Sequence, residues 1–165
     1  MELTRNDIKK MEEEIAYRKG ALRQELLENL KSARAQGDLS ENYEYVMAKR
    51  ANNQNNGRIQ YLERLIRTAK IVEDHPESDA AGLNKTVTIL IVDEGTEETY
   101  KLVSVIRGDS LSDRITLDCP IGKALNGHRA GDRVTVKVND AYSYDVIIKK
   151  VVATPDDGSD PIRQY

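Results

Sequence analysis

The sequence predicts an α+β protein in which an antiparallel α-helical coiled-coil hairpin is followed by a small, mostly antiparallel β-sheet domain with a short helix. Apolar residues recur at helical spacing over the first 73 residues, and they alternate as in strands from residue 85 onward. The chain of 165 residues has no Phe or Trp and is 32% charged, so it holds little apolar material for one large core. We therefore expect part of the protein to be long and thin.

The first helix is expected from about Thr4 to Gln36, and Gly37 is expected to end it, because glycine readily adopts the left-handed conformation that follows many helices. A second helix is expected from about Leu39 to Val72. Each carries an apolar stripe, which in the first helix consists of Ile8, Met11, Ile15, Leu22, Leu26, Leu30 and Ala33. The stripes can be buried only if the two helices fold back on each other.

Folding back predicts which residues face each other across the hairpin. Leu62 should lie near Tyr17 and Arg18, which would make the base of the hairpin apolar. Midway along the hairpin, the Asn-rich run 52–56 interrupts the apolar stripe. We expect imperfect packing and local flexibility there.

The rest of the chain is divided by stretches rich in Gly, Pro and Asp. Residues 1–74 are expected to form the hairpin domain, 75–84 a linker, 85–152 the C-terminal domain and 153–165 a flexible tail. Strands are predicted at 86–92, 98–105, 115–117, 134–138 and 142–152. A short helical turn is expected at 120–125.

The turn between the two helices carries the residues that point to chemistry. Asp38 and Glu41 have the spacing of a capping box at a helix start, and this structural role alone would account for both. Glu44 adds a third carboxylate one turn later, and no Lys or Arg lies within the tip, residues 37–45. Carboxylates are hard oxygen ligands of the kind that Mg²⁺ accepts at phosphoryl-transfer sites. The tip would bind Mg²⁺ weakly alone, but it could help to hold a second ion at a polymerase active site.

Two motifs resemble those of a known family. The first is Gly37-Asp38-Leu39-Ser40-Glu41-Asn42 with Glu44-Tyr45, and the second is Pro120-Ile121-Gly122-Lys123-Ala124-Leu125 with Gly127 and Gly131-Asp132. In order and spacing the chain resembles the bacterial Gre transcript cleavage factors, nearer the GreA branch, from about residue 4 to residue 152. This resemblance implies an FKBP-like fold for the C-terminal domain.

The resemblance also implies a function, that of a protein cofactor with no complete active site of its own. Such a factor binds bacterial RNA polymerase, inserts its hairpin into the secondary channel and stimulates hydrolysis of backtracked RNA near the nascent 3′ end, which rescues arrested complexes. The essential tip acids of the family, which share a Mg²⁺ with the polymerase, match Asp38 and Glu41. Support at the tip is expected from Ser40, Asn42, Tyr43 and Glu44. Docking on the polymerase is expected from Pro120, Ile121, Gly122, Lys123 and Leu125.

Charge is distributed unevenly along the chain. Residues 1–73 carry a net charge of +2 and residues 74–165 carry −5. Basic side chains on the hairpin could guide an RNA backbone, although exposed helix faces often carry such charges. The residues expected to guide RNA are Lys31, Arg34, Lys49 and Arg50.

Two positions depart from the family pattern. Tyr43 stands where the family commonly has Ala, and its ring either packs at the tip or contacts RNA. Cys119 replaces a frequent Ser before the second motif. As the chain's single cysteine it cannot form an internal disulfide.

Other interpretations remain open at this point. A Gre-like regulator could occupy the secondary channel and inhibit transcription without promoting cleavage. A prolyl isomerase is disfavoured, because such pockets depend on aromatic walls and the chain has neither Phe nor Trp. A generic coiled-coil adaptor would explain neither motif. We expect a cytoplasmic monomer without membrane contact, since the sequence shows no signal peptide and no apolar run of spanning length.

Overall fold

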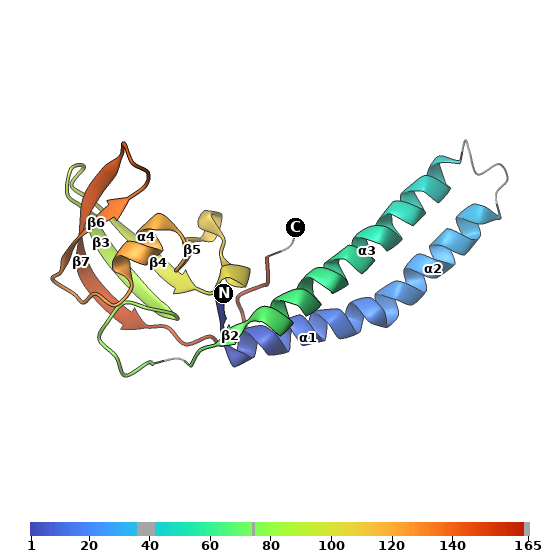
Figure 1. The fold of residues 1–165 in the computed structure, drawn as a ribbon, viewed down its shortest axis with the longest axis horizontal. Coiled ribbons are helices and arrows are strands. Elements are labelled where there is room, and N and C mark those ends of the chain that lie inside the picture. Colours follow the sequence, from blue (N-terminus) through green and yellow to red (C-terminus); the bar gives the residue numbers. More distant parts are fainter. Residues whose placement is uncertain (36–41, 74, 164–165) are drawn as a thin grey trace. The chain divides into compact units, whose positions relative to one another are not determined.

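The computed structural model describes residues 1–35, 42–73 and 75–163 (Figure 1). They fall into two compact units. The hairpin unit is Ile8–Ala69, and the C-terminal unit consists of Met1–Asp7 and Lys70–Tyr165.

The first residues of the chain belong to the C-terminal unit, whereas residues 1–74 were all expected in the hairpin. There β1 (Glu2–Leu3) pairs in parallel with β2 (Lys70–Ile71). The side chain of Leu3 is fully buried. Strands of two residues carry too little periodicity to be recognised in a sequence, so this pairing was not expected.

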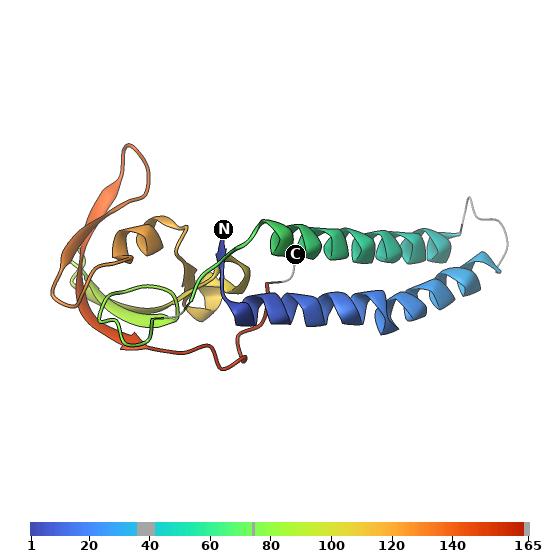
Figure 2. The same ribbon diagram turned by 60° about the horizontal axis from the view of Figure 1, so that its bottom comes forward.

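Three helices supply the hairpin: α1 (Arg5–Lys19), α2 (Ala21–Arg34) and α3 (Tyr43–Thr68). The chain runs out along α1 and α2 and returns along α3, which lies beside them (Figure 2). One continuous helix was expected for the outward arm, but it is interrupted at Gly20, whose φ of −93° and ψ of −104° are not helical. Glycine adopts such backbone conformations at little steric cost.

The returning helix starts later than expected. Its N-cap is Asn42 rather than Asp38. The predicted capping box of Asp38 and Glu41 therefore does not begin α3, and both residues lie outside the described ranges.

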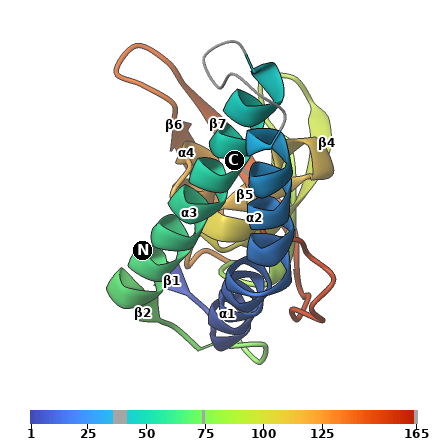
Figure 3. The same ribbon diagram turned by 90° about the vertical axis from the view of Figure 1, so that its right-hand side faces the viewer.

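A polar residue also faces the outward arm. The side chain of Asn55 donates a hydrogen bond of 3.0 Å to the main-chain oxygen of Arg18. Leu62 is fully buried in the seam, as its apolar character predicts. The helices α2 and α3 are in contact, and they also lie side by side in the view turned by 90° (Figure 3).

The C-terminal unit contains the predicted sheet, with each strand displaced by no more than two residues at either end. The strand order is β5-β4-β3-β7-β6, and only the pairing of β4 with β5 is parallel. The strands are β3 (Lys85–Ile91), β4 (Thr96–Val103), β5 (Arg114–Thr116), β6 (Arg133–Lys137) and β7 (Ser143–Ala153). Two 3-10 helices, Val105–Arg107 and Ser110–Ser112, precede β5. This confirms the predicted α+β class.

One short helix, α4 (Pro120–Leu125), covers part of the sheet. Its Leu125 is fully buried and belongs to the core of the unit. The other buried core residues are Ala81, Val87, Ile89, Leu102, Val134, Val136, Val146 and Ile148. They alternate with exposed residues along β6, as expected for a sheet with one covered face.

The predicted linker packs against the C-terminal unit. Lys85 is buried, and its Nζ donates hydrogen bonds to the carbonyl oxygens of Pro76 and Ser78, both at 2.8 Å. Ala81 lies in the core. The segment 75–84 thus connects the units in sequence and is held by one of them.

The expected tail contacts a buried guanidinium group. Arg107 is fully buried, and its Nε lies 2.8 Å from Oδ1 of Asp7. Asp160, from the tail, lies 3.3 Å from Nη1 of Arg107 and accepts a 2.8 Å hydrogen bond from Nζ of Lys101. The flexibility of residues 153–163 stays a prediction. To move, the segment would have to break the contacts of Asp160 with Arg107 and Lys101.

Among the described helices, none is long and apolar enough to cross a membrane.

Candidate functional site

Of the tip, residues 37–45, the structure describes Asn42 to Tyr45. Asp38, Ser40 and Glu41 lie outside the described residues, and their roles stay predictions. The described part shows how the helix ends that flank these acids are connected.

The side chain of Asn42 joins the two helix ends. Its Oδ1 accepts a hydrogen bond of 3.0 Å from the main-chain N–H of Tyr45, which caps α3. Its Nδ2 donates a hydrogen bond of 2.8 Å to the main-chain oxygen of Ala33, in the last turn of α2. Both polar atoms of the amide are thus used, one on each helix. Asn42 therefore limits how far the helix ends can separate.

A second contact links the same helix ends. The guanidinium carbon of Arg34 lies 5.6 Å from the centre of the Tyr45 ring, a cation–π distance. This places Tyr45 against the opposing helix end. It also means that Arg34, one of the residues expected to guide RNA, already interacts within the hairpin.

Tyr43 and Glu44 lie in the first turn of α3. Tyr43 is 73% exposed, so most of its surface is available to a partner, and whether its ring contacts RNA stays a prediction. Glu44 is exposed, and its carboxylate is favoured near a helix N-terminus by the helix dipole.

The other basic residues expected to guide RNA are on the surface of the hairpin. Lys31 lies in the last turn of α2, and Lys49 and Arg50 lie in the second turn of α3. All three are exposed. Their positions are compatible with contact to a phosphate backbone near the tip.

Within the described ranges, no group of three or more His, Cys, Asp or Glu side chains could hold a metal ion. Asp38 and Glu41 would supply two carboxylates. Mg²⁺ prefers six oxygen ligands and keeps several waters, so two carboxylates fit only part of its coordination shell. A Mg²⁺ ion at the tip would need further ligands from a partner.

The second motif forms α4, which starts at an unusual cap. The Sγ of Cys119 accepts a hydrogen bond from the N–H of Gly122 at 3.3 Å. Gly122 itself is required by close packing, because a Cβ there would lie 2.1 Å from the carbonyl oxygen of Thr116. Cys119 therefore has a capping role beyond the small apolar role that its type predicts.

Burial separates the five residues predicted to dock on a partner into two groups. Gly122 and Leu125 are buried and serve the packing of α4. Pro120 and Lys123 are exposed, and Ile121 is half-buried. A docking surface on α4 would therefore consist of these last three residues.

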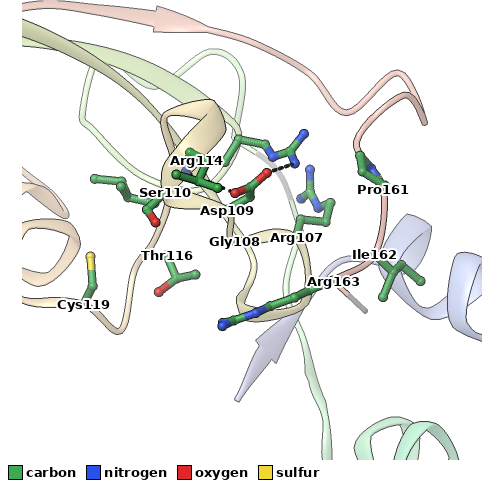
Figure 4. A pocket seen from close by; sticks show the side chains of 12 residues that line it. Arg107, Gly108, Asp109, Ser110, Arg114, Thr116, Cys119, Pro161, Ile162 and Arg163 are labelled. Carbon is green, nitrogen blue, oxygen red and sulfur yellow. Dashed lines mark hydrogen bonds and ion pairs between the residues drawn. The ribbon is translucent and has the colours of Figure 1, made fainter. Parts of the chain in front are cut away.

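An open pocket of about 680 Å³ lies next to the start of α4, within the C-terminal unit (Figure 4). It is bounded by the segment from Arg107 to Thr116, by Cys119 and by residues 161–163. Nη2 of Arg114 lies 3.1 Å from Oδ2 of Asp109 at its edge. Arg107 and Arg114 are paired with carboxylates, and Arg163 also lines the pocket.

Sequence reasoning named Asn42 as a supporting residue but missed that it caps α3. Asn is among the preferred N-cap residues, so the sequence did contain this signal. The contact with Ala33 could not be seen, because it depends on how the two helix ends meet.

The chain is similar to solved structures of two proteins. GreA factor homolog 1 (Gfh1) of Thermus thermophilus is 22% identical, with coverage of 92% of this chain and 97% of that one, at a TM-score of 0.42. The transcription elongation factor GreA/GreB from Nitrosomonas europaea is 26% identical over 58% of this chain and 79% of that one, at a TM-score of 0.39. Neither similarity is high enough to support an argument about this chain.

The sequence matches one protein family over nearly its whole length. Residues 1–71 match the family model for the N-terminal part of transcription elongation factors, and residues 75–152 match the C-terminal model of GreA/GreB. Transcription elongation factor GreA of Bacillus licheniformis is 44% identical over 136 residues, which cover 82% of this chain and 86% of that protein. GreA of Thermotoga maritima is 38% identical over 135 residues, with the same coverage. The chain belongs to the GreA/GreB family of transcription elongation factors.

Proposed function

We propose that this protein is a transcript cleavage factor. It inserts its hairpin into the secondary channel of bacterial RNA polymerase and stimulates hydrolysis of backtracked RNA near the 3′ end. The observation that carries the proposal is that Asn42 joins the ends of α2 and α3, and that the sequence has Asp38 and Glu41 in the segment connecting these ends. A pair of acids on such a connection suits delivery into another protein's active site.

The protein contributes carboxylates and their position, and the polymerase contributes the remaining parts of the site. Asp38 and Glu41 would hold a Mg²⁺ shared with the polymerase. When bound, that ion supplies activation of the attacking water and stabilises the charge that develops on the phosphate. Tyr43 and Glu44 follow these acids closely in the sequence, and both are exposed.

The C-terminal unit would dock on the polymerase through the exposed part of α4. Pro120 and Lys123 are exposed there, and Ile121 is half-buried. The protein would act as a monomer, since one hairpin enters one channel. It would be a cofactor of the polymerase in the cytoplasm and not an enzyme by itself.

The test uses a stalled, backtracked elongation complex with labelled RNA. The wild type should release short 3′ fragments in a Mg²⁺-dependent reaction, and the shortened RNA should resume elongation. Asp38→Asn and Glu41→Gln, which preserve size, should each slow cleavage by about 100-fold or more while leaving polymerase binding unchanged. Glu28→Gln is the matched control, since Glu28 is an exposed acid of α2 outside the tip.

Two outcomes would count against the proposal. If the wild type binds the polymerase and reduces elongation without releasing fragments, the protein is a channel regulator that inhibits transcription. If Asp38→Asn and Glu41→Gln cleave as fast as Glu28→Gln, the tip acids do not take part. A Lys123→Glu variant should weaken polymerase binding and leave the tip intact, and unchanged binding would remove α4 from the docking surface.

A further inference from the structure

A cluster of polar side chains lies inside the hairpin unit, where a coiled-coil seam is ordinarily apolar. Asn55 is 3% exposed and lies on the same face of α3 as the buried Ile59. Asparagine in such a position is costly unless both atoms of its amide are bonded. The cluster, which we call the polar lock, consists of Glu14, Arg18, Asn55 and Arg58.

The two arms of the hairpin exchange directional hydrogen bonds in the polar lock. Nδ2 of Asn55 donates to the main-chain oxygen of Arg18 at 3.0 Å, and Oδ1 of Asn55 accepts from Nη1 of Arg18 at 3.3 Å. Nε and Nη2 of Arg58 donate to the two carboxylate oxygens of Glu14 at 2.9 and 3.1 Å. Nε of Arg18 donates to Glu14 at 2.7 Å within α1. Each contact between the arms requires one particular alignment of α1 with α3.

Two guanidinium groups of the lock, those of Arg18 and Arg58, surround the single carboxylate of Glu14. Burial opposes ionisation of Glu14, but hydrogen bonds from Arg58 and Arg18 and the charges of both lower its pKa. Arg58 is itself largely buried, and its guanidinium lies 5.6 Å from the ring centre of Tyr61. If α3 moved by one helical turn, these charged groups would lose their partners while still buried.

The lock lies directly beside the break in the outward arm. Arg18, whose main-chain oxygen is bonded by Asn55, precedes Gly20 by two residues. Beyond the break, Ala33 is the buried residue of α2, while Leu22, Leu26 and Leu30 are only half-buried. A thin apolar seam specifies register weakly, because neighbouring alignments bury similar area. The lock supplies the specificity that the seam lacks.

We infer that the polar lock fixes the register between the two arms of the hairpin and thereby the position of the tip acids. The inference rests on the proposed function for its consequence, since only a tip that works inside a partner needs exact placement. One helical turn of sliding corresponds to about 5.4 Å. Displacements of about 1 Å in a catalytic group can slow a reaction by about 100-fold.

The variant Asn55→Leu tests whether the polar lock fixes the register between the arms or only stabilises the hairpin. Leucine adds apolar contact in the seam, but it removes the hydrogen bonds to the main-chain oxygen and to Nη1 of Arg18. These effects oppose each other, so the free energy of unfolding should change by less than the larger effect alone would change it. The register of the variant, however, should become mixed. Asn53→Leu is the matched control, because Asn53 is exposed and lies on the same helix.

Register is measured in the free protein from the distance between two spin labels. The labels are attached at Asn29→Cys on α2 and Gln60→Cys on α3, both exposed, in a Cys119→Ser background that removes the single native cysteine. The locked hairpin should give one narrow distance distribution. Asn55→Leu should add a population displaced by up to about 5 Å, one turn of sliding, and Asn53→Leu should not. Arg58→Met, which removes the paired bonds to Glu14, should broaden the distribution as well and serves if Asn55→Leu does not fold.

Cleavage of backtracked RNA tests the consequence. Asn55→Leu should cleave about 10- to 100-fold more slowly than Asn53→Leu at saturating factor. An unchanged distance distribution in both Asn55→Leu and Arg58→Met would overturn the lock. A shifted distribution with wild-type cleavage would overturn its role in placing the tip. Absence of cleavage with the wild type would refute the proposed function instead, and the distances in the free protein would still decide the lock.

Discussion

Asn42 offers the sharpest test of how the tip is built, because one amide performs two separable tasks. Its Oδ1 caps α3 through the N–H of Tyr45, and its Nδ2 bonds the main-chain oxygen of Ala33 in α2. Replacing an Asn N-cap by Ala costs about 1 kcal/mol. Losing a hydrogen bond to a carbonyl oxygen costs about 1 kcal/mol more. Asn42→Ala should therefore lower the free energy of unfolding of the hairpin by about 2 kcal/mol.

Asn42→Asp separates the two contributions. Aspartate caps helices as well as asparagine does, and its charge is favoured at the N-terminus of α3. It has no N–H to donate, however, and its carboxylate would face the carbonyl oxygen of Ala33. We expect a loss of about 1 kcal/mol, half of that for Asn42→Ala.

Urea unfolding followed by far-UV circular dichroism measures both losses, since the hairpin holds most of the helical residues. Asn29→Ala, an exposed change within α2, is the control and should be neutral or slightly stabilising. If Asn42→Asp were as stable as wild type, the bond to Ala33 would contribute nothing. If Asn42→Asp and Asn42→Ala lost the same amount, the cap would contribute nothing.

Changes at three positions test the C-terminal unit, and one change in the hairpin serves as a comparison. Cys119→Ser should raise the free energy of unfolding by about 0.5 kcal/mol, because a hydroxyl oxygen is a better N-cap acceptor than a thiol. Cys119→Ala, which removes the acceptor, should lower it. If thermal unfolding gave the opposite order for the two variants, the capping role would be contradicted. Gly122→Ala should lower the free energy of unfolding by about 1–3 kcal/mol, because its Cβ would lie 2.1 Å from a main-chain oxygen. Gly57 lies inside α3, and a Cβ there would have no atom within 4 Å. Gly57→Ala should therefore raise the free energy of unfolding by up to about 1 kcal/mol. Burial alone would raise the pKa of Asp160, but the hydrogen bond and charge of Lys101 and the nearby guanidinium groups lower it. The stability that this carboxylate contributes is therefore present above about pH 4 and is lost as the pH falls toward the lowered pKa. Asn at position 160 cannot titrate. The melting temperature of Asp160→Asn should therefore fall less steeply than that of the wild type as the pH is lowered below about 5.

The strands could be predicted because their signals are local. Alternation of apolar and polar residues, together with the turn at residues 93–96, locates β3 and β4 to within two residues. The same holds for α4, where Pro120 begins the helix and buried Leu125 lies near its end. Each of these elements is determined by neighbours within about ten residues in sequence.

The features that were missed depend on partners far away in the chain. Asn55 lies in a run for which imperfect packing was expected, yet its bonds to Arg18 span 37 residues and make it one of the most buried side chains of α3. The break at Gly20 was missed because a single glycine inside a helical pattern is usually tolerated at a small cost. Both features concern how two helices meet, which the periodicity of one helix does not contain.

The two asparagines of the hairpin follow a common physical logic. Asn42 and Asn55 each use both polar atoms of the amide, and each donates across the hairpin to a main-chain oxygen near the end of a helix. Leucine in these places would bury more apolar surface, but apolar contact has no direction and permits sliding. Leucine at position 55 would exchange directional bonds for apolar contact of similar strength. A hairpin that has to bring two carboxylates to a fixed point in another protein gains more from an amide, because the bonds it makes exist in a single register.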